Sequence, residues 1–142
     1  MKTVYKVLTP SLQSVASYFP SFPKELVLQY EPGNWTCGRE NSKLFCFESL
    51  QDAIDWITPL KEKKWFVDQQ FDIWECQAVN VRARTRVVSF RSSNRDIFME
   101  LFRKLWNNSY SGTISKKRIN RYTERKISCA EKICLVKRVC VL

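Results

Sequence analysis

The sequence contains no histidine and only three glycines among its 142 residues. Without histidine, a serine or cysteine nucleophile lacks its usual general base. The glycines are too few for the glycine-rich loops that hold phosphate groups in P-loop and dinucleotide-binding enzymes. These absences argue against several large classes of enzyme, so we expect a non-enzymatic protein, and the sequence predicts no cofactor.

Two further absences concern membranes and export. No apolar run approaches the roughly 18 residues that a membrane-spanning helix needs. The first residues, MKTVYKVLTPSLQ, lack the apolar core of a secretory signal, so we expect a chain that is not exported. We therefore predict no transmembrane segment and a reducing compartment, in which thiols stay free.

Most of the six cysteines lie within apolar runs, where a free thiol behaves as a small hydrophobic side chain. Cys46, Cys76, Cys134 and Cys140 are of this kind. The closest spacing is that of Cys129, Cys134 and Cys140, which fits no common zinc pattern because such patterns contain closer pairs. We predict six free thiols and no metal site.

The net charge of +10 is distributed unevenly along the chain. Residues 1–80 carry eight Lys and Arg against ten Asp and Glu, whereas residues 81–142 carry sixteen against four. Such an excess of positive charge attracts phosphate groups, anionic lipid or an acidic protein surface. The basic C-terminal half therefore predicts an acidic partner, but composition alone does not say which of the three.

Alternating or apolar runs that end at turn residues predict the strands. Their ranges are 4–8, 26–30, 43–47, 72–79, 84–90 and 133–142. Pro32 and Gly33 occupy the second and third positions of a type II turn at 31–34. Strands with a few helices between them predict an α+β fold, a single domain over 1–142 with a mainly antiparallel sheet and two or three helices.

Helix starts are marked by two capping patterns. Ser49 and Asp52 open one helix, and Ser93 and Asp96 open another at 96–106, whose apolar stripe from residue 97 to 106 we expect in the core. A short helix at 11–19, with Ser11 as its N-cap, is the third prediction. Because both Ser49 and Ser93 have this capping role, we do not interpret them as nucleophiles.

The basic residues between positions 82 and 126 are the candidate partner-binding residues. They are Arg82, Arg84, Arg86, Lys116, Lys117, Arg118, Arg121, Arg125 and Lys126. The first three alternate along a predicted strand, which places their guanidinium groups on one face for binding carboxylate or phosphate. Tyr110 and Tyr122 add stacking surfaces for a single-stranded nucleic acid. The alternative interpretation is a solvated basic face that serves solubility.

Five segments carry a resemblance to known proteins: 5–7, 30–36, 44–50, 73–76 and 130–138. In these segments the chain resembles small, uncharacterised proteins of phages and large DNA viruses. The resemblance implies a viral binding or structural protein, for example a minor virion component, in the virion or the host cytoplasm. Its basic C-terminal surface would dock onto an acidic protein or a nucleic acid. Residues 82–126 lie outside the resemblance.

A weaker resemblance links the order of elements to the core of small ADP-ribosyltransferases. It places Tyr5 or Lys6, Phe47 or Ser49, and Glu75 at positions comparable to those that hold nicotinamide and orient the ribose. The first strand contains neither the histidine nor the arginine of that family. This alternative predicts NAD binding and an activity that Glu75→Ala abolishes, whereas period-two alternation favours Glu75 as a solvated strand residue.

Overall fold

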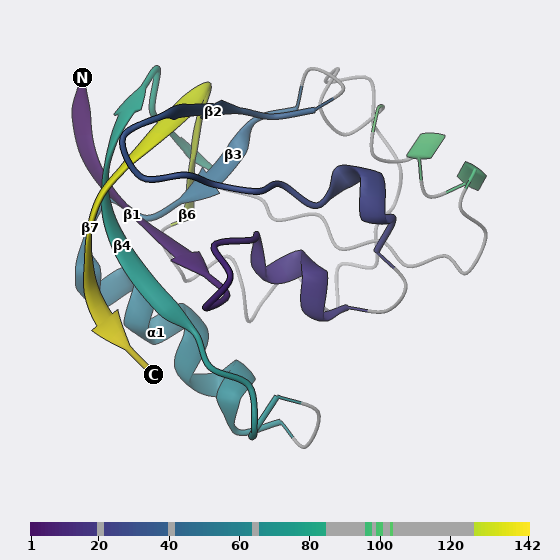
Figure 1. The fold of residues 1–142 in the computed structure, drawn as a ribbon. Coiled ribbons are helices and arrows are strands. Elements are labelled where there is room, and N and C mark those ends of the chain that lie inside the picture. The colour runs from purple at the N-terminus through teal and green to yellow at the C-terminus, as the bar shows by residue number, and fades with distance from the viewer. Residues whose placement is uncertain are drawn as a thin grey trace.

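A computed structural model describes residues 1–19, 22–39, 42–63, 66–84, 96, 97, 99, 100, 103 and 127–142. Within these ranges the protein forms seven strands, one completely described α-helix and two short 3-10 helices, and the five described residues between 96 and 103 are also helical (Figure 1). All strand pairs are antiparallel, which confirms the α+β class with a mainly antiparallel sheet.

The strands form two sheets. The larger has the order β1-β4-β7-β2 and the smaller has the order β3-β6-β5. Their bounds are β1 Lys2–Leu8, β2 Trp35–Cys37, β3 Leu44–Cys46, β4 Asp72–Val79, β5 Arg82–Arg84, β6 Ile127–Ala130 and β7 Lys132–Val141. The alternating sequence predicts β4 with its exact bounds, because one face of this strand, at Cys76 and Ala78, is buried.

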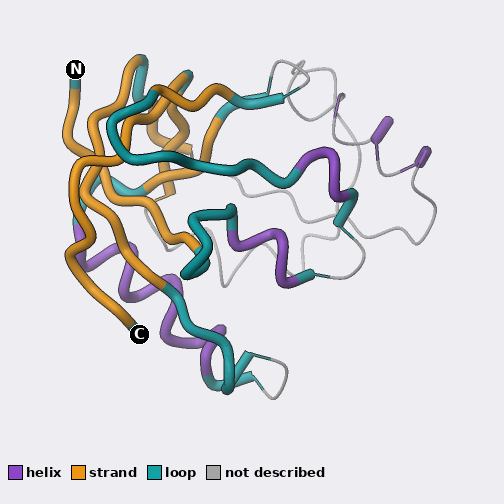
Figure 2. The backbone as a smooth tube through the Cα atoms, viewed as in Figure 1, coloured by secondary structure: helices purple, strands orange, loops and turns teal. Residues whose placement is uncertain are grey.

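Two bent segments that pair with each other, β4–β5 and β6–β7, belong to both sheets (Figure 2). Strand β4 continues into β5 through Asn80, whose φ of 55° is one that asparagine tolerates better than most residues. Opposite this corner, the Glu131 amide donates to the Val79 carbonyl at 2.9 Å where β6 passes into β7. On the other side, Tyr5 and Phe47 exchange backbone hydrogen bonds of 2.7 and 2.9 Å, so β1 also links the two sheets.

The α-helix α1, Leu50–Lys61, begins where the capping pattern predicts. Ser49 is the N-cap, and its hydroxyl accepts a hydrogen bond of 3.0 Å from the Asp52 amide. Ala53, Ile57 and Leu60 are buried, and the helix crosses one face of the larger sheet (Figure 1). The local pattern therefore places both the start of α1 and its inner face.

Ser49→Ala should lower the free energy of unfolding by about 1 kcal/mol, because the Asp52 amide loses its acceptor at the first turn of α1. Urea unfolding followed by circular dichroism measures the change. Ser49→Asp is the matched control and should stay within about 0.5 kcal/mol of the wild type, since aspartate also caps helices. Equal losses in both variants would contradict a capping role.

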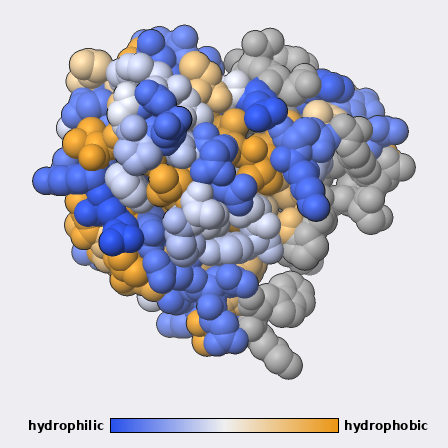
Figure 3. All heavy atoms as spheres, viewed as in Figure 1, coloured by the Kyte–Doolittle hydropathy of each residue, from blue (hydrophilic) through white to orange (hydrophobic). Residues whose placement is uncertain are grey.

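Strand β1 separates two hydrophobic cores. Val4 and Leu8 face the smaller sheet and pack with Cys46, Cys76 and Ile133. On the opposite face, Val7 packs with the buried residues of α1 and with the aromatic side chains of the second core. Alternation along a single strand therefore supplies both layers. At the surface, hydrophilic and hydrophobic side chains are interspersed over the face drawn in Figure 3.

The sequence predictions between residues 11 and 30 are wrong in part. The helix is a 3-10 helix, η1 Val15–Tyr18, and it starts after Ser14 rather than Ser11, because Leu12 adopts a positive φ of 63°. Residues 26–30 form no strand. A second 3-10 helix, η2 Lys24–Leu26, takes up the start of this segment, and a single bridge joins Gln13 to Gln29.

Two further differences concern β2, β6 and residues 96–106. Strands β2 and β6 were not predicted, because they are too short to show alternation. Residues 96, 97, 99, 100 and 103 are helical, but Ile97 is 49% exposed, whereas Met99 is buried against Leu26. The prediction that Ile97 faces the core is therefore wrong. The rest of this helix and the predicted strand beyond Arg84 lie outside the described residues.

Candidate functional site

The predicted basic surface starts and ends at two neighbouring strands. Arg84 at the end of β5 is the register partner of Ile127 at the start of β6, so the chain leaves and re-enters the sheet at one place. Arg82 is exposed, and Arg84 lies two residues further along the same strand. Two of the candidate arginines are therefore on the strand from which the basic segment leaves the smaller sheet. The junction formed by Arg84 and Ile127 is called the root of the basic segment below.

The other candidate residues are not described by the structure. Arg86, Lys116, Lys117, Arg118, Arg121, Arg125 and Lys126 lie outside the described residues. For these residues the prediction of a common partner-binding surface stays a prediction. What the structure adds is the position of the root, on the strand pair β5-β6 of the smaller sheet.

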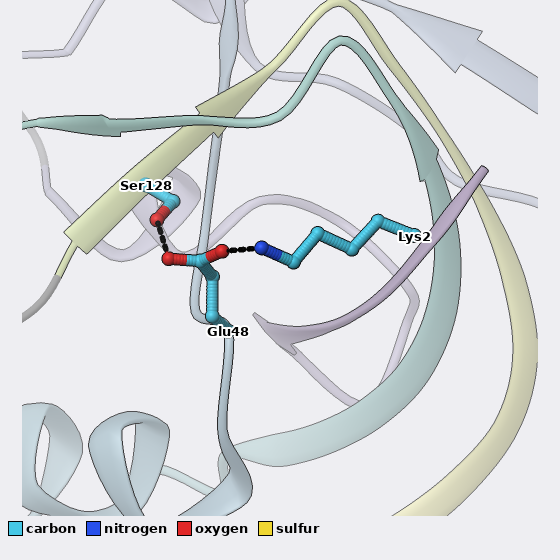
Figure 4. Close-up of polar contacts among 3 residues, drawn as sticks. All are labelled: Lys2, Glu48 and Ser128. Carbon is cyan, nitrogen blue, oxygen red and sulfur yellow. Dashed lines mark hydrogen bonds and ion pairs between the residues drawn. The ribbon is translucent and has the colours of Figure 1, made fainter.

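A polar cluster lies next to this root, where Lys2, Glu48 and Ser128 point toward one another (Figure 4). The Ser128 hydroxyl donates to Oε2 of Glu48 at 3.2 Å, and the Lys2 ammonium pairs with Oε1 of the same carboxylate. Ser128 follows Ile127 in β6 and is the register partner of Ala83 in β5. The cluster therefore ties the start of β1 and the end of β3 to the root of the basic segment.

The Ser128–Glu48 contact has the atoms of a nucleophile and a base, but not their accessibility. Ser128 is 1% exposed, and the Glu48 carboxylate is already neutralised by Lys2. A substrate would have to reach a hydroxyl inside the sheet interface, so the geometry favours a structural contact. The sequence analysis missed it because the two residues are 80 positions apart and no local pattern connects them.

A second group of titratable side chains surrounds Lys6 between the two sheets. Lys6 is 9% exposed, and its ammonium donates to the Phe45 carbonyl at 2.7 Å. The same nitrogen lies 5.7 Å from the centre of the Tyr30 ring. Burial lowers the pKa of Lys6 from its ordinary value of 10.5, and the thiols of Cys46, Cys76 and Cys129 act in the opposite direction.

The thiols beside Lys6 are not activated. Burial raises the pKa of Cys46 to about 11 and that of Cys76 to about 12, although the Lys6 charge acts to lower both. A thiol with a raised pKa carries little thiolate, which is the reactive and metal-binding form. All six cysteines are free thiols, and among the described residues no three His, Cys, Asp or Glu side chains are grouped to hold a metal ion.

We expect one fast-reacting thiol in the native protein. Cys37 is exposed, whereas Cys46, Cys76 and Cys129 are buried and Cys134 and Cys140 are half-buried. Alkylation of the native protein followed by peptide mass spectrometry should therefore label Cys37 first and the three buried thiols only after unfolding. Denatured protein should give six labels. Fast native labelling of Cys46 or Cys76 would contradict the buried arrangement around Lys6.

The residues of the ADP-ribosyltransferase resemblance meet only in part. Tyr5 is paired with Glu75 on one side and with Phe47 on the other, so these three form a row across the sheet. Lys6 points to the opposite face, and Ser49 is occupied as a helix cap.

This row does not have the form of a nicotinamide site. Phe47 is 5% exposed, and Glu75 lies 3.8 Å from the Lys137 ammonium. A hollow of about 330 Å³ elsewhere is lined by Gln13, Ser17, Phe19, Phe22, Lys24 and Val27, away from the row. The described residues therefore give no observation that favours NAD chemistry.

Comparison with known proteins identifies no relative. No family of known proteins, no curated protein and no solved structure matches this chain. Among the described residues, no helix is both long enough and apolar enough to span a membrane. The viral and ADP-ribosyltransferase resemblances accordingly stay predictions from the sequence.

Proposed function

We propose that this protein is a non-enzymatic binding protein whose basic segment, residues 82–126, docks onto an acidic surface of another protein. One observation carries the proposal. The segment contains thirteen Lys and Arg against three Asp and Glu, whereas the rest of the chain contains eleven of each. The whole net charge of +10 therefore belongs to this segment.

The position of the segment in the fold supports a binding role. The segment begins in β5 and ends at the residue before β6, and Arg84 in β5 is the register partner of Ile127 in β6. It is therefore an insertion between two paired strands of a sheet. Long connections carried by a rigid scaffold are common locations of binding residues. A concentrated positive charge repels itself and is costly unless a partner neutralises it. A virion in which the chain docks on acidic neighbours is the setting that the viral resemblance suggests for this proposal.

A matched pair of triple variants tests the proposal. In the first variant, Lys117, Arg118 and Arg121 of the basic segment are replaced by Glu. In the second, three exposed lysines outside the segment are replaced by Glu, namely Lys24, Lys43 and Lys63. Both lose the same net charge. Binding to fluorescein-labelled poly-glutamate, a model of an acidic protein surface, is measured by anisotropy. The first variant should bind at least about tenfold more weakly, a loss of about 1.4 kcal/mol, and the second should stay within about threefold of the wild type.

Two outcomes would contradict the proposal. Equal losses in both variants would mean that only net charge matters and that the segment is no specific surface. A single-stranded DNA that binds more tightly than poly-glutamate, with an affinity that falls by about 10³ or more between 50 and 200 mM salt, would favour nucleic acid instead. Circular dichroism of both variants should match the wild type, because Lys and Arg side chains are rarely buried in proteins and surface substitutions rarely change stability by more than about 0.5 kcal/mol.

A further inference from the structure

Among the described residues, no strand pairs with the outer edge of β7 over residues 136–141, which is called the open edge below. On this side β2 pairs only with Lys132, Ile133 and Cys134, and the Gly33 amide adds one bond of 3.1 Å to the Leu135 carbonyl. Past that point no described strand pairs with the outer side of β7, and this C-terminal part of β7 lies at the left of the sheet in Figure 1, where it runs to the C-terminus. An open edge presents backbone N–H and C=O groups that a further strand can use.

Three exposed side chains of this open edge are apolar. Val136, Val139 and Val141 are 50%, 36% and 49% exposed. Between β4 and β7 the register shifts at two bulges, and Val136 and Val139 are the residues left without a partner in β4. A bulge increases the local twist, and bulges and edge lysines limit the pairing of an edge with other strands. A strand that binds here has to match the twist and the charge of this edge.

The exposed charge of the edge is positive. Lys137 lies 3.8 Å from Glu75 and Arg138 lies 3.7 Å from Asp72, but the side-chain exposures are 65% and 55% for the two cations against 28% and 2% for the two carboxylates. The two cations are therefore more accessible to solvent, and to a partner, than the two carboxylates. The Lys137–Glu75 pair is partly exposed and worth only about 0–1 kcal/mol, and the exposed guanidinium of Arg138 has several N–H donors, so both cations can also bind a second carboxylate.

This charge argues against a second copy of the chain as the partner. Two β7 edges paired antiparallel over residues 136–141 would place Lys137 opposite Cys140 and Arg138 opposite Val139, so the four cations would lie within four consecutive residue pairs. Like charges this close together repel one another. An acidic strand would instead place carboxylates beside the cations and its apolar side chains beside the valines.

We propose that residues 136–141 of β7 bind an extended acidic segment of another protein as an added strand. Backbone hydrogen bonds along the open edge supply affinity, as in other cases of strand addition. Specificity comes from apolar side chains that pack against Val139 and from carboxylates that pair with Lys137 or Arg138. These two cations lie on opposite faces of β7, so an alternating strand pairs with one of them. This site uses none of the residues of the basic segment, so it is a second docking surface of the molecule.

Two synthetic peptides of about ten residues test this site, one alternating Val with Glu and the other alternating Val with Lys. Hydrogen exchange of the full chain, read residue by residue by NMR, reports which amides each peptide protects. The Val–Glu peptide should protect amides within 136–141, and the Val–Lys peptide should not. The variant with Lys117, Arg118 and Arg121 changed to Glu should keep this protection, because the proposed site consists of residues 136–141 only.

A pair of variants at one exposed position separates charge from folding. Val139→Glu should weaken the binding of the Val–Glu peptide at least about tenfold. Val139→Lys removes the same valine but keeps the electrostatic attraction, so its affinity for the peptide should stay within about threefold of the wild type. Equal protection by both peptides, no protection of 136–141, or loss of protection in the basic-segment variant would overturn the proposal. So would a dimer in light scattering that Val139→Glu dissociates, because the partner would then be a second copy.

Discussion

Replacing Lys6 with methionine is expected to raise the free energy of unfolding by about 1–4 kcal/mol near pH 7. The ammonium of Lys6 is buried between the two sheets, and one backbone carbonyl, at Phe45, is its hydrogen-bond acceptor among the described residues. Methionine has a similar volume and adapts to irregular cores, so it removes the cost of burying the charge without opening a cavity. The lost bond to the Phe45 carbonyl offsets only part of this gain.

The gain should shrink as the pH rises. Burial lowers the pKa of Lys6 below 10.5 in the folded protein, so between that lowered pKa and 10.5 the unfolded chain holds more protons than the folded one. The stability of the wild type therefore increases with pH in this window, whereas the Lys6→Met variant has no such contribution. Urea unfolding of both proteins at about pH 7, 8, 9 and 10 measures the difference. The thiols of the unfolded chain ionise at about pH 8.5, but both proteins contain the same six, so this contribution largely cancels in the comparison.

Lys2→Met is the matched control for this prediction. Lys2 lies on the same strand and the same face as Lys6, but its side chain is 56% exposed and its pair with Glu48 lies at the surface. Removing it should change stability by less than about 1 kcal/mol. A difference between Lys6→Met and the wild type that stays constant from pH 7 up to 10.5 would contradict a lowered pKa of Lys6, and a destabilised Lys6→Met would contradict a net cost of its burial.

Phe71→Ala should lower the free energy of unfolding by about 3–5 kcal/mol. The Phe71 side chain is fully buried, and its ring packs edge-on against Tyr18 with centroids 5.4 Å apart. Phe66 lies at 6.4 Å in the same core. Because the Phe71 backbone also exchanges hydrogen bonds of 2.9 and 2.8 Å with Leu142, the surrounding chain is held and cannot collapse into the cavity.

Phe19→Ala is the comparison for Phe71→Ala. Phe19 stacks on Phe66 with ring centroids 5.2 Å apart but is 39% exposed, so its truncation should cost about 1 kcal/mol and leave no enclosed cavity. Chemical denaturation of both variants under one set of conditions gives the two values. If the two losses are equal, the aromatic cluster around Phe71 is not the core that its burial indicates.

Local features of the sequence were enough for several elements. The hydroxyl of Ser49 caps α1 because the acceptor and the Asp52 amide are three residues apart. Gly33 has the positive φ of 84° that its place in the turn requires, and the Asn34 amide donates to the Glu31 carbonyl at 3.1 Å. Alternation in β4 is also a local property. In each case the determining groups lie within a few residues of one another.

The site was predictable only in its charge. Composition located the basic segment, since counting Lys and Arg needs no structure. It did not reveal that Arg84 and Ile127 are neighbours, so that the segment is inserted between paired strands. The polar contact of Glu48 with Ser128 likewise joins residues that no periodicity relates.

The sequence by itself determined the antiparallel α+β class, the start of α1, the bounds of β4 and the concentration of positive charge, because these follow from propensities and patterns of neighbouring residues. Only the tertiary structure decided that Lys6 is buried, that residues 26–30 form no strand and that Val136 and Val139 bulge from an open edge. The physical reason is that strand pairing and burial depend on which distant segment lies alongside. That choice is made by the packing of the whole chain.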